Sequence, residues 1–374
     1  VQSCRLGKLF MMLSVAFVII RECATALKMA DTMLSKNPFG LYDKADDKSS
    51  CGVGFLTRKD GIQSHDLLRK VNQALCSVPH RGGMSAEGVG DGAGVTLDLS
   101  VDFFSKLVGV PLKKGHFGVG NFFMPSDASY IAAAEEIIES SLVKYGMSLL
   151  LKRDVEVDLS ILSDKAVEKQ LSIKQWIFRT NRSCSEKQTK KDLYNSLMEI
   201  ESKAFTDEDM DGLYPLSISA SIQVLKGRLT SSELVPFFRD LNDPDHKVHS
   251  AYFHTRFSTN TEPHPSMAQP FRLIAHNGEL NTDKKNRLSE AAIAQSKNRN
   301  IIRPKGQSDS CRLDQTLNAR VVEDDLDLVA SVVSMMPPAW ENDKSIDPNV
   351  REMLEFFSLH EEKNDGPAAL IFGD

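Results

Sequence analysis

A cysteine at the head of a short apolar run is the feature that most constrains how this chain folds. The run Cys51-Gly-Val-Gly-Phe-Leu56 follows a polar, charged segment at residues 46–50 and predicts a buried strand. If the preceding segment is removed, the cysteine becomes the first residue of that strand and carries a free α-amine. Such an amine, with a reference pKa of about 7.7–8.0, can accept the thiol proton. A buried structural cysteine explains this residue, taken alone, equally well.

The hydrophobic pattern predicts strands and helices that interleave along the chain. Ser64 and Asp127 are expected to begin two of the helices. The predicted strands cover residues 51–57, 95–99, 217–224, 251–258, 271–275 and 368–372. The predicted helices cover residues 64–75, 127–146, 281–295, 308–322, 325–336 and 347–359, and residues 186–212 are predicted to form a helix and a loop. Since the regular βαβ rhythm of a doubly wound sheet is absent, we expect an α+β fold with two antiparallel sheets between layers of helices.

The composition argues against several classes of function. The 374 residues carry a formal net charge of −6, which gives no electrostatic reason to expect nucleic acid or an anionic membrane as a partner. Six scattered cysteines form no C-x-x-C pair, so neither a zinc site nor a disulfide framework is expected. A reducing, cytoplasmic environment fits this pattern best.

The N-terminal residues are expected to lie outside the folded domain. The apolar run at residues 9–20 imitates a signal peptide, but it is shorter than the about 20 residues that span a bilayer. An over-extended start over residues 1–28 is favoured, with Met29 or Met33 as a later start, and residues 1–50 as a whole are interpreted as a leader or propeptide. One domain is expected over residues 51–374, and it is expected to continue beyond Asp374 because the last predicted strand ends there.

Three further sites carry groups suited to amide chemistry on an amino acid. Arg256 follows a predicted strand, and its guanidinium can bind an α-carboxylate in bidentate fashion, although an isolated arginine more often forms a surface ion pair. Asn277 and Gly278 together offer a side-chain amide and a backbone N–H as an oxyanion hole, but Asn-Gly is also the commonest hairpin turn. Asp309, at a helix start, can bind an α-ammonium group, although on spacing alone helix capping is the favoured interpretation.

Other patterns argue against a bound nucleotide or metal. The glycine-rich stretch at residues 88–94 partly imitates a dinucleotide loop, but a strand follows it where that loop requires a helix. A tight loop near the active site is the better interpretation. His65, His80, His254 and His276 lack the spacing of metal ligands, so no catalytic metal is expected.

Nine short motifs, read in order, resemble one known family. They are Cys51-Gly-Val-Gly-Phe-Leu56, His80-Arg-Gly-Gly83, Gly90-Asp-Gly-Ala-Gly94, His254-Thr-Arg-Phe-Ser-Thr-Asn260, Ala268-Gln-Pro-Phe-Arg272, His276-Asn-Gly-Glu279, Ser308-Asp-Ser310, Pro337-Pro-Ala-Trp340 and Asp365-Gly-Pro-Ala368. Together they resemble the glutaminase domain of glutamate synthase large subunits, from about residue 39 to the C-terminus. Gly83 departs from the alanine often found there, and we attach no functional meaning to it.

The resemblance implies a class II glutamine amidotransferase with the N-terminal-nucleophile hydrolase fold, a four-layer αββα sandwich. In that family the cysteine becomes residue one, so residues 29–50 would be a propeptide. By motif, Cys51 matches the nucleophile, Arg256 the carboxylate clamp, Asn277 and Gly278 the oxyanion hole, and Asp309 the α-ammonium site. The implied reaction converts L-glutamine to glutamate and ammonia through a Cys51 thioester.

The resemblance also implies partners outside this chain. Ammonia would pass to a synthase site on further domains or on another subunit, where the FMN and iron–sulfur cofactors of the family bind. No group of cysteines here could hold an iron–sulfur centre, so no cofactor is assigned to this chain. The electron donor, whether reduced nicotinamide or ferredoxin, is left open.

Three alternatives remain open at this point. Another amidotransferase, of the phosphoribosyl-pyrophosphate or glucosamine-6-phosphate type, is disfavoured by the long segment between Asp91 and His254. An acylase acting on other amides would not need Arg256 and Asp309. A non-catalytic regulatory or interaction module would keep the fold but would not be cleaved before Cys51.

Overall fold

The strands form two four-stranded antiparallel sheets and one two-stranded pair in the computed structural model, which describes residues 52–181, 183–256, 265–298, 307–364 and 368–373. The first sheet has the order β1 (Val53–Thr57), β8 (Ser250–His254), β2 (Ala93–Asp98) and β7 (Ile222–Gly227). The second has the order β4 (Ser148–Asp154), β5 (Ile173–Arg179), β3 (Phe117–Phe123) and β6 (Tyr214–Ser219). The pair joins β9 (Ile274–Gly278) to β10 (Ala368–Phe372).

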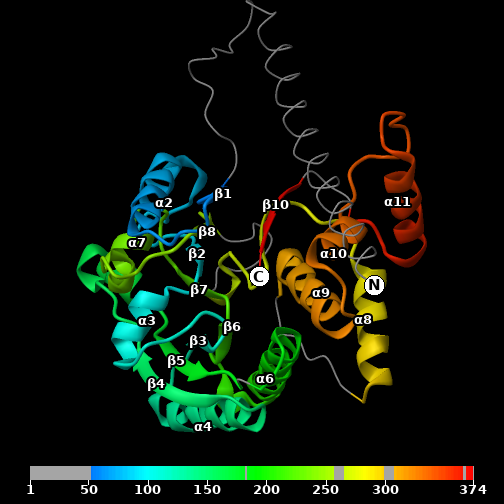
Figure 1. Cartoon of the computed structure of the whole chain (residues 1–374). Coiled ribbons are helices and arrows are strands. Elements are labelled where there is room, and N and C mark those ends of the chain that lie inside the picture. The colour runs from blue at the N-terminus through cyan, green and yellow to red at the C-terminus, as the bar shows by residue number, and fades with distance from the viewer. Residues whose placement is uncertain (1–51, 182, 257–264, 299–306, 365–367, 374) are drawn as a thin grey trace, which may run out of the picture. The chain divides into compact units, whose positions relative to one another are not determined.

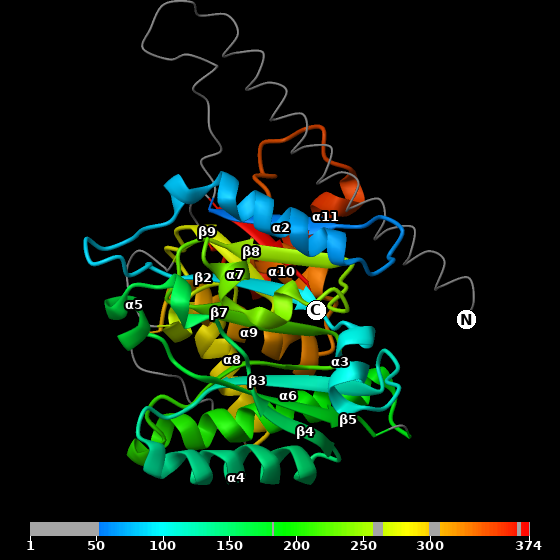
Figure 2. The same ribbon diagram turned by 90° about the vertical axis from the view of Figure 1, so that its left-hand side faces the viewer.

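The described residues also form α-helices. They are α2 (His65–Ser77), α3 (Val101–Val108), α4 (Ala128–Lys144), α5 (Asp164–Glu168), α6 (Glu186–Thr206), α7 (Leu234–Phe237), α8 (Lys284–Ser296), α9 (Asp309–Glu323), α10 (Leu328–Met335) and α11 (Pro348–His360). Figure 1 shows α2 above the first sheet and α4 and α6 below the second, and Figure 2 shows the same succession of layers from the side. The α+β arrangement of antiparallel sheets between helices that the sequence predicts is confirmed.

The outer face of the second sheet is closed by an apolar layer. Trp176 on β5 and Phe122 on β3 are fully buried and lie edge to face, with ring centroids 5.2 Å apart. They pack against residues of α4 and α6 in one cluster, which includes Ala134, Ile138, Leu142, Leu193 and Ile200. Burial of large aromatic rings stabilises such a layer by about 1.5–3 kcal/mol for each side chain.

The helix starts predicted from capping residues are confirmed. Ser64 accepts a hydrogen bond from the backbone N–H of Asp66 at the start of α2, and Leu67, Leu68, Val71 and Leu75 of this helix are buried. Asp127 accepts one from Ser129 at the start of α4. These side chains satisfy N–H groups that have no partner within the helix.

The single strand predicted over residues 217–224 is wrong, because the chain turns in its middle. β6 ends at Ser219 in the second sheet and β7 begins at Ile222 in the first. The Ser219 hydroxyl accepts hydrogen bonds from the backbone N–H groups of Ser221 and Ile222, at 3.0 and 3.2 Å, and so stabilises the turn. A turn made by a serine side chain contains neither Gly nor Pro. The alternation of apolar and polar residues therefore predicted one continuous strand.

A row of polar side chains on the second sheet satisfies the backbone at the edge of the first. Asn121 donates to the carbonyl of Val224 on β7 at 3.0 Å, and the Ser217 hydroxyl accepts from the Val224 N–H at 3.0 Å. Gln175 donates to the Asn121 oxygen at 2.9 Å and accepts from Arg153 at 2.9 Å. An unpaired sheet edge inside a protein would leave buried backbone groups without partners. These side chains therefore join the two sheets.

Contacts divide the described chain into two units, of which the smaller holds residues 339–356. There Arg351 lies over the Trp340 ring, 5.7 Å from its centroid, and donates to the carbonyl oxygens of Glu341 and Asp343. The sheets and residues 357–373 belong to the larger unit. In the ranges given above, no helix is long and apolar enough to cross a membrane.

Replacing Asn121 by Leu should lower the free energy of unfolding by about 1–3 kcal/mol, because the buried carbonyl of Val224 would lose its donor. Denaturant unfolding of both proteins measures the difference. The matched control is Gln73→Leu on the exposed side of α2, which should change stability by less than about 0.5 kcal/mol. Equal stabilities for the two variants would show that the side-chain bonds to β7 do not join the sheets.

Candidate active site

Arg256 lies directly after β8, where the chain leaves the core. His254 and Thr255 before it are each only 1% exposed, whereas Arg256 is half-buried. No acidic side chain of the described ranges lies within ion-pair distance of its guanidinium, so the interpretation as a surface ion pair is not supported. A guanidinium can bind a carboxylate in bidentate fashion.

Asn277 and Gly278 form the end of β9. His276 before them is 1% exposed, Asn277 is half-buried and Gly278 is exposed. Gly278 pairs with Ala368 of β10 and has a φ of 150°, a conformation that favours glycine. The hairpin-turn interpretation of this dipeptide is wrong, because both residues lie in the strand ladder.

Asp309 is the first residue of α9, and Ser308 is its cap. The Ser308 hydroxyl accepts from the Cys311 N–H at 3.1 Å, so the interpretation of Asp309 as the capping residue is wrong. One carboxylate oxygen of Asp309 accepts from the Ser310 N–H at 2.7 Å and the other from the Leu280 N–H at 3.2 Å. Asp309 thereby contacts the backbone two residues beyond Gly278, and its half-buried carboxylate retains lone pairs for a cation.

A neutral histidine connects the arginine to the strand with the Asn-Gly pair. His254 donates from Nε2 to the carbonyl oxygen of His276 at 3.1 Å, and its Nδ1 accepts the backbone N–H of Arg256 at 3.2 Å. Only the neutral imidazole can do both. Burial lowers the pKa of His254 to about 4, which keeps this form at neutral pH.

Helix α9 and the segment before β9 hold the strand at several points. Asp314 accepts from the N–H groups of Leu273 and Ile274, at 2.7 and 3.2 Å, where β9 begins. The Ser310 hydroxyl contacts Nδ1 of His276 at 2.8 Å. The strand and the first turns of the helix are therefore fixed relative to each other, which sets the position of Asp309 beside the end of β9.

The structure thus brings four of the five predicted site residues into one network of contacts, namely Arg256, Asn277, Gly278 and Asp309. The fifth, Cys51, lies outside the described residues, as do Ser258, Thr259 and Asn260 of the arginine motif. Gly52, the residue after Cys51, accepts the Thr255 N–H at 2.8 Å, next to Arg256. The first described residue of the domain is therefore adjacent to the arginine.

Sequence reasoning missed the residues that support this network. His254 and His276 were considered as metal ligands and as parts of motifs, and Gln269 only as part of a motif. One signal was present, because side chains two apart on a strand share a face, and His254 stands two residues before Arg256. The pairing of these histidines across two strands could not be read from spacing.

The glycine-rich stretch at residues 88–94 leads into a strand, as predicted. β2 begins at Ala93, and the Asp91 N–H donates to the carbonyl of Gly83 at 2.8 Å. The two glycine motifs therefore pack on each other. A dinucleotide loop would open a helix at this point, so that interpretation is excluded by the strand.

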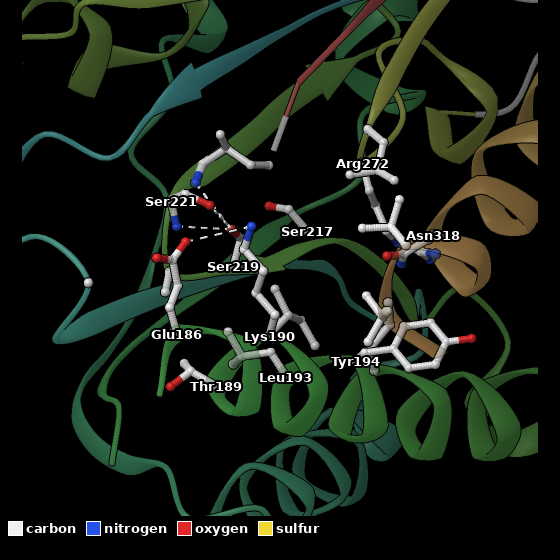
Figure 3. Close-up of a pocket in the computed structure, with 18 of the residues that line it drawn as sticks. Glu186, Thr189, Lys190, Leu193, Tyr194, Ser217, Ser219, Ser221, Arg272 and Asn318 are labelled. Carbon is white, nitrogen blue, oxygen red and sulfur yellow. Dashed lines mark hydrogen bonds and ion pairs between the residues drawn. The ribbon is translucent and has the colours of Figure 1, made fainter. Parts of the chain in front are cut away.

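A cavity of about 450 Å³ opens away from these residues, between α6, the β6–β7 turn and α9. Figure 3 shows Glu186 and Lys190 of α6 beside Ser219 and Ser221, with Arg272 and Asn318 on the other side. None of the predicted site residues lines it. Within the described part of the chain, no three His, Cys, Asp or Glu side chains cluster as a metal site would require.

Comparison with known proteins identifies the family of this chain. A family model for class II glutamine amidotransferases matches residues 51–374, beginning at the cysteine. The chain belongs to this family. Glutamate synthases are among the proteins that it is similar to. One is the ferredoxin-dependent glutamate synthase 1, chloroplastic/mitochondrial, of Arabidopsis thaliana, 32% identical over 89% of this chain and 22% of that protein.

Two further relatives come from a bacterium and a yeast. The glutamate synthase [NADPH] large chain of Azospirillum brasilense is 32% identical over 89% of this chain and 23% of its own length. The glutamate synthase [NADH] of Saccharomyces cerevisiae is 30% identical over 90% of this chain and 16% of its own length. The amidotransferase chain therefore spans about a fifth of the relatives that it matches.

Acidification from pH 6.5 toward pH 4 should destabilise the fold. Burial lowers the pKa of both His246 and His254 to about 4, so the unfolded chain binds more protons than the folded one in this window. Each histidine then contributes a loss of up to roughly 1.4 kcal/mol per pH unit. Urea unfolding at several pH values measures the slope.

His246→Gln is the control variant for this measurement, because His246 lies between Gln223 and the Asp240 carbonyl, outside the candidate site. It should reduce the slope by about the contribution of one histidine. A stability that does not change between pH 6.5 and 4.5 would contradict the burial of neutral imidazoles.

Proposed function

We propose that this chain hydrolyses the side-chain amide of L-glutamine to L-glutamate and ammonia. The observation that supports this best is the bridge from the Arg256 backbone through His254 to His276, because it connects the residue proposed to bind the carboxylate to the strand that carries Asn277 and Gly278. Asp309 joins the same network through Leu280. A cation, an anion and two amide donors at one place match the α-carboxylate, the α-ammonium and the polarised side-chain carbonyl of glutamine.

Each residue then has one role in the reaction. Arg256 binds the α-carboxylate, and Asp309 the α-ammonium. The Cys51 thiolate, formed by proton transfer to its own α-amine, attacks the carboxamide carbon. The Asn277 side-chain amide and the Gly278 N–H stabilise the negative oxygen of the tetrahedral intermediate.

The intermediate collapses by breaking the carbon–nitrogen bond. The α-ammonium of Cys51, which has received the thiol proton, protonates the departing ammonia, and a glutamyl thioester remains on Cys51. Water then attacks the thioester carbon, the carbon–sulfur bond breaks, and glutamate leaves with the thiol restored. This mechanism requires Cys51 to be the first residue, so we propose that the residues before it are removed.

The destination of the ammonia is part of the same proposal. The relatives are named glutamate synthases, and the chain matches about a fifth of their length. We propose that ammonia passes to a synthase site on further domains or another subunit, and that FMN and an iron–sulfur cluster bind there, with no cofactor in this chain. The scattered cysteines support a cytoplasmic setting.

The first test is the intact mass and N-terminal sequence of the purified chain, before and after incubation with a diazo-ketone analogue of glutamine. We expect a chain that begins at Cys51 and gains one label. Cys51→Ala should lose the label, whereas Cys76→Ala, which removes an exposed free thiol elsewhere, should keep it. An unlabelled chain that still carries residues before Cys51 would favour a non-catalytic module that has kept the fold.

A pair of variants separates substrate binding from transition-state stabilisation. Asn277→Ala should lower kcat by about 10²–10³ with little change in KM, the usual effect of losing one oxyanion donor. Arg256→Ala should instead act mainly on KM, raising it by about 10- to 100-fold, because a charged hydrogen bond contributes about 1.5–3 kcal/mol. Steady-state kinetics with glutamine measures both constants.

Arg58→Ala removes an exposed arginine that pairs with Asp60 and should leave both constants unchanged. An unchanged KM in Arg256→Ala would indicate an acylase that does not recognise the amino-acid group. An unchanged kcat in Asn277→Ala would remove this residue from the mechanism.

A further inference from the structure

Lys226 is a fully buried cation that the proposed mechanism does not use. It lies on β7 with 1% of its surface exposed, and no carboxylate of the described ranges pairs with it. Burial lowers its pKa to about 7, while Cys311 and Asp314 act in the opposite direction and Arg272 adds to the lowering. A buried charge without a counter-ion is costly, so its contacts define what it stabilises.

The hydrogen bonds of the ammonium all go to one segment of the chain, while the ring of Tyr214 on β6 lies 5.5 Å from Nζ. Nζ donates to the carbonyl oxygens of Ser266, Ala268 and Pro270, at 2.9, 2.7 and 3.4 Å. The ring of Phe271, in the same segment, lies 4.9 Å from Nζ, a distance at which an aromatic face stabilises a cation. All three ammonium donors are therefore directed at residues 266–270.

The first sheet leaves room for this segment at a glycine. Gly94 on β2 pairs with Lys226 in the ladder. A Cβ added at Gly94 would lie 2.5 Å from the carbonyl oxygen of Gln269 and 3.0 Å from Cδ of Pro270. Contacts this short do not occur with real side chains, so glycine permits the close approach. The segment thus lies directly on the sheet, with Lys226 beside it.

This segment also holds the strand with the Asn-Gly pair. The side chain of Gln269 accepts the N–H of His276 at 2.7 Å and donates to its carbonyl at 2.8 Å. His276 immediately precedes Asn277 and Gly278. The sequence of contacts therefore runs from Lys226 through the carbonyls at 266–270 to Gln269, and from there to the backbone of β9.

We infer that Lys226 is a positioning residue for the oxyanion donors at the end of β9. Without its three donors, the segment at 266–270 would lose its fixed place on the sheet, and the Gln269 side chain would no longer define the position of His276. A misplacement of the oxyanion donors by even a fraction of an ångström weakens transition-state stabilisation more than ground-state binding. The inference rests on the proposed glutamine hydrolysis.

The test is a series at position 226 in the full chain, processed as the wild type is. Lys226→Met keeps the length but removes every donor, and Lys226→Gln keeps two uncharged donors. We expect kcat for glutamine to fall by about 10- to 100-fold in the Met variant and by less in the Gln variant. KM should change by less than about threefold in both.

A second readout isolates the oxyanion. The aldehyde analogue of glutamate forms a thiohemiacetal whose oxygen occupies the oxyanion position, whereas the product L-glutamate binds without one. The Met variant should bind the aldehyde about 10- to 100-fold more weakly than the wild type, with the affinity for L-glutamate changed by less than about threefold. A loss of general stability would not separate these two ligands.

Arg153→Met is the matched control, because Arg153 is a mostly buried cation that pairs with Asp240 away from the site. It should lower stability and leave kcat and KM unchanged. If the Met variant fails to fold, the same measurements are made on Gln269→Leu. This change removes the side chain that contacts His276 directly, and the same fall in kcat is expected.

Two results separate this inference from the function on which it rests. A wild-type chain that hydrolyses no glutamine would overturn the proposed function and the inference with it. An active wild type, with a folded Lys226→Met or Gln269→Leu variant of unchanged kcat and unchanged aldehyde affinity, would overturn the positioning role alone.

Discussion

The backbone of His276 makes hydrogen bonds to two side chains that come from other parts of the chain, Gln269 and His254. Its imidazole makes a third contact, to Ser310 at the start of α9. Each such buried bond contributes about 0.5–1.5 kcal/mol, but leaving one partner unsatisfied costs about 1–3 kcal/mol. These contacts fix the position of His276 at the end of the strand. They therefore also fix where the next residues, Asn277 and Gly278, lie.

The same arrangement explains why the candidate site is open to solvent although its supports are buried. Arg256, Asn277 and Asp309 are half-buried, and each has a buried neighbour in sequence that makes the structural contacts. The neighbours provide rigidity, and the three side chains remain accessible to a ligand.

Much of the fold could be predicted from the sequence, and each wrong prediction has a physical cause. Helix starts at Ser64 and Asp127 follow from local capping, and the strand after the glycine-rich stretch follows from period-two alternation. The single strand over 217–224 failed because the Ser219 hydroxyl makes a turn without Gly or Pro.

The residues of the candidate site could be predicted from motifs, but their supporting contacts could not. Motif order predicts Arg256, Asn277, Gly278 and Asp309 as site residues, whereas hairpin and capping rules suggested other roles for three of them. Those rules use neighbours in sequence, whereas Gly278 pairs with Ala368 and the carboxylate of Asp309 contacts Leu280. The supporting contacts, from His254 to His276 and from Gln269 to His276, join separate segments, so no local pattern predicts them.

The most direct test of this account is a crystal structure of the processed chain with the glutamate aldehyde bound. The account predicts a covalent bond from Cys51 to the aldehyde carbon, the α-carboxylate on Arg256 and the α-ammonium on Asp309. The former aldehyde oxygen should accept hydrogen bonds from the Asn277 side chain and the Gly278 N–H. A ligand bound in the cavity between α6 and α9, or one held at the cysteine without contact to Arg256 and Asp309, would contradict it.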